Sequence, residues 1–144
     1  MDESINKDNY CKLLENDMVF NSTNGTYTLL FLETCLSTDV QIVSLEYTLE
    51  HIYPQKNKAN LKNGKNIDKL GNITLLEGKN SKNGHKGNSS IGAKDYSKKI
   101  ESYNGSSSKI TNKIPTKYTI KFDEIDIVSR TKELAELLNK YTLY

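Results

Sequence analysis

A histidine next to an acidic residue, followed along the chain by two asparagines, is the set of residues best suited to chemistry. Glu50 and His51 close one apolar run, Asn72 opens a second apolar run, and Asn80 follows eight residues later. Histidine accepts a proton readily near neutral pH, and carboxylate and amide oxygens are ligands for Mg²⁺ or Mn²⁺. This order of residues is typical of a site that hydrolyses phosphodiesters with one divalent metal ion.

Each of these residues can be given a role. His51 is the candidate general base, Glu50 and Asn80 are the candidate metal ligands, and Asn72 holds either the following loop or the imidazole ring. Simpler roles stay open, because Asn72 could cap a hairpin and Asn80 could begin a helix. Three further residues lie close enough in the sequence to be rival ligands: Asn83, His85 and Asn88.

Positive charge is concentrated in the middle of the chain. Residues 56–121 contain fifteen lysines and four acidic residues, a net charge of +11, whereas the whole chain carries +2. This favours contact with a polyanion such as DNA, and Lys79, Lys82 and Lys94 are the candidate contacts. A solvated lysine-rich loop region is an equally good interpretation, and the pattern gives no indication of base-specific recognition.

The spacing of apolar residues predicts the elements that must position this site. Two helices are expected before it and a hairpin around it, with a mobile loop inside the hairpin and at most one or two helical turns around Asn80. A lysine-rich helix, a flexible connection and a closing amphipathic helix should follow. The helices are expected at 6–20 and 27–36, with a turn at 21–25 between them, and a strand is the alternative for 27–36. The strands are expected at 43–49, with Glu50 at the strand end, and at 70–76, with the loop at 55–69 between them. The later ranges are helix 93–103, connection 105–108 and the closing helix from about 127.

Length and composition narrow the class of protein. A chain of 144 residues and 16.3 kDa fits one domain, and no run approaches the roughly 18–20 apolar residues of a membrane span. The beginning of the chain does not have the pattern of a secretory signal. Cys11 and Cys35 lack CxxC spacing, which argues against a zinc knuckle or a disulfide scaffold. We therefore expect a cytoplasmic protein without a membrane partner.

The motifs resemble a known family. Leu49-Glu50-His51-Ile52-x-Pro54, the run Leu70–Leu76 and Asn80-Ser81 resemble the C-terminal HNH nuclease domain of GmrSD-type modification-dependent restriction enzymes. They are similar, more distantly, to the HNH domain of RNA-guided nucleases. Ile91 and Lys94 lie where the family has an aromatic residue followed three residues later by lysine. Residues 127–134 resemble its closing helix, so the resemblance covers roughly residues 27–142.

The resemblance implies a fold and an activity. The fold is an α+β, mostly helical single domain over residues 1–144, with N-terminal helices at about 6–36, a ββα-metal (His-Me finger) motif at about 43–90 and C-terminal helices at about 93–142. The activity is cleavage of DNA, expected to be double-stranded, with one Mg²⁺ or Mn²⁺ ion, in defence against foreign or modified DNA. Such domains usually follow a nucleotide-dependent module in the same polypeptide. Two alternatives stay open: a catalytically silent nucleic-acid-binding or partner-docking module, and a nuclease that acts on RNA or single strands.

Overall fold

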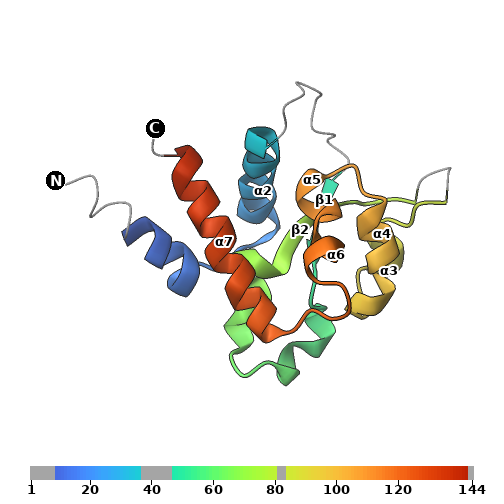
Figure 1. Cartoon of the computed structure of the whole chain (residues 1–144). Coiled ribbons are helices and arrows are strands. Elements are labelled where there is room, and N and C mark those ends of the chain that lie inside the picture. The colour runs from blue at the N-terminus through green and yellow to red at the C-terminus, as the bar shows by residue number, and fades with distance from the viewer. Residues whose placement is uncertain (1–8, 37–46, 81–83, 143–144) are drawn as a thin grey trace.

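The computed structural model describes residues 9–36, 47–80 and 84–142, and it confirms the predicted α+β class (Figure 1). Strand β1 (Tyr47–His51) pairs antiparallel with β2 (Ile73–Glu77), so that Glu50 lies opposite Thr74 and His51 opposite Ile73. The predicted hairpin is therefore present. Its second strand begins three residues later than predicted, because Leu70–Asn72 form a 3₁₀ turn, η4. The predicted beginning of the first strand, at 43–46, lies outside the described residues.

The second N-terminal helix begins within the segment that was predicted to be a turn. Helix α2 spans Ser22–Leu36, and a π-helical turn, η1 (Leu13–Asp17), precedes it. The Asn21 side-chain oxygen accepts hydrogen bonds from the backbone N–H groups of Thr23 and Asn24, both at 2.9 Å. In turn, the Asn24 side-chain oxygen accepts one from the Asn21 N–H at 2.7 Å. These side chains satisfy the unpaired groups at a helix N-terminus. The turn predicted at 21–25 is therefore wrong, since its asparagines begin a helix.

The segment between the strands is structured, and the prediction of a loop with little to bury at 55–69 is wrong. It folds into 3₁₀ turns η2 (Gln55–Asn60) and η3 (Gly64–Asp68), and the side chains of Ile67 and Lys69 are buried. The carboxylate of Glu124 accepts hydrogen bonds from the backbone of Lys62 at 2.7 Å and Asn63 at 3.0 Å. It also accepts one from the Asn66 amide at 2.8 Å. A residue about sixty positions away thus orders this segment.

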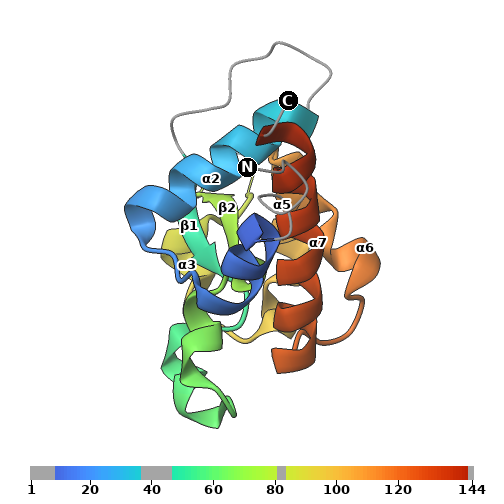
Figure 2. The ribbon, with the colours of Figure 1, turned by 90° about the vertical axis from the view of Figure 1, so that its left-hand side faces the viewer.

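Helix α7 (Glu124–Thr142) is the predicted closing helix, and it packs directly on the turn that carries Asn72. A side chain at Gly71 would place its Cβ 2.1 Å from the Ile127 carbonyl oxygen, so only glycine permits this approach. Arg130 donates to the carbonyl oxygens of Gly71 and Ile73 at 2.9 and 2.8 Å. The described partners of the Arg130 guanidinium are thus backbone carbonyl oxygens on both sides of Asn72. Figure 2 shows α7 beside α2, with the hairpin behind.

Short helices complete the C-terminal half. They are α3 (Asn88–Ile91), the 3₁₀ turn η5 (Tyr96–Lys98), α4 (Ile100–Asn104), α5 (Lys109–Asn112) and α6 (Ile114–Lys117). The helix predicted at 93–103 is therefore divided into η5 and α4. Among the described residues, which exclude 81–83, the first helix after β2 begins at Asn88. The connection predicted at 105–108 contains two buried serines, Ser106 and Ser108.

The hairpin belongs to two apolar clusters. Ile73 and Leu75 of β2 pack with residues of α2 and α7, whereas Leu76 packs with Ile52, Ile91 and residues of α4, α6 and α7. Alternate residues of a strand point to opposite faces, so one strand can serve both clusters. The sheet is thus fixed between two groups of helices. In the described part of the chain, no helix combines the length and the apolar character that a membrane crossing requires.

Candidate active site

Glu50 and His51 meet at one cavity. The cavity has a volume of about 350 Å³ and is lined by both residues together with Gln55, Asn88 and Gly92, among others. Glu50 is almost completely buried, with 1% of its surface exposed, whereas 14% of the His51 side chain is exposed. The end of β1 therefore brings the predicted base and one predicted metal ligand to the same space.

A buried lysine lies beneath these two residues. The Lys99 ammonium binds Glu50 Oε1 in a short contact, the His51 carbonyl oxygen at 2.6 Å and the Gly92 carbonyl oxygen at 3.0 Å. Three acceptors match the three N–H donors of an ammonium group. The Tyr103 hydroxyl donates to Glu50 Oε1 at 3.2 Å. Lys99 therefore joins the carboxylate, the backbone of the histidine and the turn after α3.

Burial determines the electrostatics of this group. Burial raises the pKa of the Glu50 carboxyl, and the Lys99 charge opposes that shift. Burial lowers the pKa of the Lys99 ammonium, and Glu50 opposes it in turn. The second carboxylate oxygen of Glu50, Oε2, is buried and has no hydrogen-bond partner among the described residues. A buried oxygen without a donor is costly, and such groups are common where a ligand or ion binds.

His51 is held by an acidic residue that the sequence did not reveal. Its Nε2 lies 2.9 Å from Asp68 Oδ1, and Asp68 ends the turn η3. The contact fixes the direction of the ring, and Nδ1 is the ring nitrogen that does not contact Asp68. Asp68 belongs to the segment that we predicted as a loop, so nothing in its local pattern indicated a partner for His51.

Asn72 holds the loop that follows His51. It is fully buried; its Oδ1 accepts from the Tyr53 N–H at 2.7 Å, and its Nδ2 donates to the Tyr53 carbonyl at 3.0 Å and the Ile67 carbonyl at 2.8 Å. Its backbone carbonyl accepts from the Ile52 N–H. The sequence left open whether Asn72 holds the loop or the imidazole ring. These hydrogen bonds are to the backbone of Tyr53 and Ile67, so Asn72 holds the loop.

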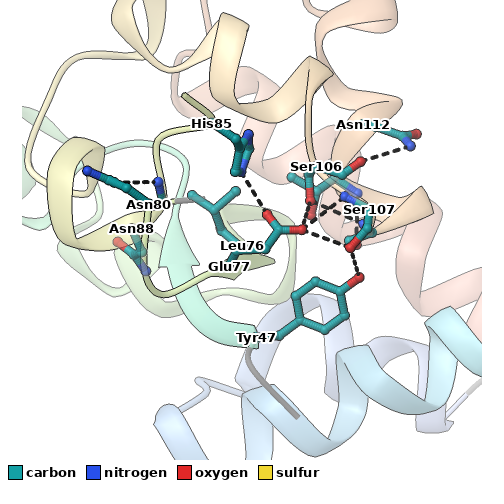
Figure 3. A network of polar contacts seen from close by, with 12 residues as sticks. Tyr47, Leu76, Glu77, Asn80, His85, Asn88, Ser106, Ser107 and Asn112 are labelled. Atoms are coloured by element: carbon teal, nitrogen blue, oxygen red, sulfur yellow. Dashed lines mark hydrogen bonds and ion pairs between the residues drawn. The ribbon is translucent and has the colours of Figure 1, made fainter. Parts of the chain in front are cut away.

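The two asparagines after β2 have different surroundings. Asn80 is exposed, and its Oδ1 accepts from the Gly87 N–H at 3.0 Å and the Ser90 hydroxyl at 2.8 Å (Figure 3). Asn88 donates its amide to the Leu49 carbonyl at 2.9 Å and lines the cavity of His51. Metal binding by Asn80 stays a prediction, and Asn88 is the rival ligand that lies at the cavity. Asn83 lies outside the described residues.

The lysine that packs at the site is not the one we assigned. Lys79 and Lys94, two of the predicted DNA contacts, are exposed, and Lys82 lies outside the described residues. The family's aromatic and lysine were assigned to Ile91 and Lys94. Tyr96 and Lys99 have the same three-residue spacing, and both are buried. The spacing together with a true aromatic residue was the signal that could have identified Lys99.

The donors at this cavity suit a hard cation that keeps much of its water. No group of three or more His, Cys, Asp and Glu side chains within the described ranges could hold a metal ion. One carboxylate oxygen and one amide are nevertheless enough for Mg²⁺, which usually keeps several waters and binds the substrate phosphate. The unpartnered Oε2 of Glu50 fits such a role.

Comparison with known proteins establishes the class of this molecule, which is that of a restriction endonuclease domain. The model of the C-terminal domain of GmrSD restriction endonucleases matches residues 5–137 of the 144. The chain therefore belongs to this family, which confirms the resemblance seen in the sequence. Neither the curated proteins nor the solved structures contain a match to the chain.

Proposed function

We propose that this domain is a metal-dependent endonuclease that hydrolyses DNA phosphodiesters with His51 as the general base. The observation that carries the proposal is the common cavity of His51 and Glu50, with a buried carboxylate oxygen that lacks a partner. Membership of a restriction endonuclease family supports DNA as the substrate and defence against foreign or modified DNA as the role.

The contacts of His51 specify how the base would act. In the neutral ring Nε2–H donates to Asp68, so Nδ1 takes the proton from the attacking water. The Asp68 carboxylate then stabilises the imidazolium that forms. Asn72 acts through the loop that it holds, and it is therefore a positioning residue.

The metal would be held by oxygen atoms. Glu50 Oε2 and the Asn88 amide oxygen are the donors at the cavity, and Asn80 is the ligand predicted from the sequence. One bound Mg²⁺ or Mn²⁺ ion would neutralise charge on the leaving oxygen. The order β1, β2 and α3 supports a ββα-metal core, with its helix beginning at Asn88.

Cleavage of plasmid DNA tests the proposal. The chain is incubated with supercoiled plasmid and Mn²⁺ or Mg²⁺, beside His51→Ala and the control Glu136→Ala, at an exposed residue of α7 that lines neither cavity described below. We expect His51→Ala to lose roughly 10²–10⁴-fold in rate, the usual contribution of a general base. Glu136→Ala should remain within a few-fold of the wild type. Equal rates for the wild type and His51→Ala, or no cleavage by any of the three, would contradict the proposal.

One observation favours the silent-module alternative. Lys99 already balances the charge of Glu50, so this carboxylate has a counter-charge without a metal ion. If Mn²⁺ does not bind in calorimetry while DNA binds without being cut, the chain is a binding module. The second alternative is a nuclease for RNA or single strands. Incubating the chain with labelled RNA in competition with duplex DNA tests it, because that alternative predicts that the RNA is cut in preference to the duplex.

A further inference from the structure

A second cavity lies on the other side of the segment that borders the candidate active site. Its volume is about 370 Å³. Asn88, Gly92 and Ala93 line the first cavity, whereas Ile91 and Lys94 line the second. One short segment, residues 88–94, therefore separates the two cavities. A polymer bound at His51 and crossing this segment would reach the second cavity next.

Positive charge without acidic partners surrounds this second cavity. Lys86, Lys94 and Lys98 line it and are exposed, and none of them forms an ion pair with any described residue. Glu101 is the acid among the lining residues. Other exposed lysines do have partners: Lys56 with Asp95, Lys117 with Glu133 and Lys121 with Asp123. Gathering like charges disfavours the folded state, and binding of a polyanion relieves the repulsion.

The wall of the second cavity is fixed to the sheet. His85 lines the cavity, and its Nε2 lies 3.0 Å from Glu77 Oε2 at the end of β2. Figure 3 shows Glu77 between His85 and the serines at 106 and 107. A Cβ at Gly105 would lie 2.9 Å from His85 Nδ1, so glycine lets the ring lie against the end of α4. The lysines therefore surround a preformed hollow.

We propose that this second cavity binds a backbone phosphate of the DNA substrate, on the far side of residues 88–94 from His51. The inference rests on the proposed function and identifies where the uncleaved part of the strand is held. Lysine ammonium groups are point charges that contact phosphate without reading bases. The site would therefore position DNA of any sequence.

Paired charge variants test this phosphate site. The double variant Lys94→Gln/Lys98→Gln removes two positive charges from the cavity, and Lys117→Gln/Lys121→Gln removes two elsewhere. Binding of the full chain to a fluorescent DNA duplex is measured without metal at several salt concentrations. We expect the cavity variant alone to bind about ten-fold more weakly, with the slope of log K against log salt reduced by about one. Equal affinities and slopes for the two double variants would overturn the phosphate site.

Cleavage kinetics separate this inference from the proposed function. At saturating DNA the cavity variant should keep kcat within a few-fold while its KM rises, and His51→Ala should lose kcat and keep DNA binding. Loss of binding in the cavity variant supports the phosphate site even if His51→Ala cuts as well as the wild type, a result that would refute only the proposed base. Removal of repelling charges should not lower the melting temperature, so weak binding by a destabilised cavity variant would count against the site.

Discussion

The chain has two histidines, and both contact a carboxylate through Nε2, but their surroundings differ. His51 lies 2.9 Å from Asp68, and His85 lies 3.0 Å from Glu77. Glu77 Oε1 also accepts hydrogen bonds from the Ser106 hydroxyl, the Ser107 N–H and the Ser107 hydroxyl. The Asp68 side chain is 37% exposed and the Glu77 side chain 19%. The second pair is thus part of a saturated network.

This difference indicates how a reactive site can be distinguished from a structural contact. Near His85 the carboxylate has donors on both oxygens, and the network ties two loops to β2. Near His51 the neighbouring Glu50 has one oxygen without a partner and a buried ammonium on the other. A histidine–carboxylate contact alone therefore does not indicate catalysis. Buried groups with unmet hydrogen-bonding capacity beside a cavity are the stronger indication.

Removing the buried ammonium should have the largest effect on stability. Lys99→Met leaves the Glu50 carboxylate buried without a counter-charge, which should lower the free energy of unfolding by about 3–5 kcal/mol. Urea denaturation measures the loss, and Lys98→Met, at the adjacent exposed lysine, is the matched control. The double variant Glu50→Gln/Lys99→Met should recover part of the stability because it leaves no isolated charge. Equal urea midpoints for the two methionine single variants would show that the pair does not stabilise the site.

The two carboxylates should then differ in their effect on cleavage. Asp68→Asn keeps the size of the side chain but cannot stabilise a charged imidazole, so kcat should fall about ten-fold, as for other supporting residues around a reactive group. Glu77→Gln, the matching change at His85, should keep kcat within two- to three-fold. Initial rates at saturating plasmid measure both effects. A larger loss for Glu77→Gln than for Asp68→Asn would reverse our assignment of the two histidines.

The parts of the site that were predictable lie in short stretches of sequence. Glu50 and His51 are adjacent, and Asn72 begins an apolar run, so a local pattern identified them; the stripe on the closing helix likewise identified α7. Three other residues reach the site only through tertiary packing: Asp68 contacts His51, Lys99 contacts Glu50, and Asn88 lines the cavity. The segment 55–69 shows why, because its order depends on hydrogen bonds to Glu124 in a distant helix. No local periodicity encodes such a contact.

The smallest expected effect is on the pH dependence of stability, and it concerns Glu77, the carboxylate that contacts His85. Burial alone would raise the pKa of Glu77, but hydrogen bonds from Ser107 and Ser106 outweigh it and lower the pKa below its ordinary value. A carboxyl group whose pKa is lower in the folded state stabilises the fold above its unfolded pKa, roughly 4.3, and loses that contribution as the pH falls through the folded pKa.

The stability advantage of the wild type over Glu77→Gln should therefore be constant near neutral pH and shrink below about pH 4.3. Urea midpoints measured from pH 7 to pH 3 test this, and Glu136→Gln, at an exposed glutamate of α7, provides the baseline for removing one negative charge. An advantage that grows as the pH falls would mean that the serines do not favour the ionised carboxylate. His85 would then lie against a neutral acid, and the network around Glu77 could not be the structural counterpart of the His51 site.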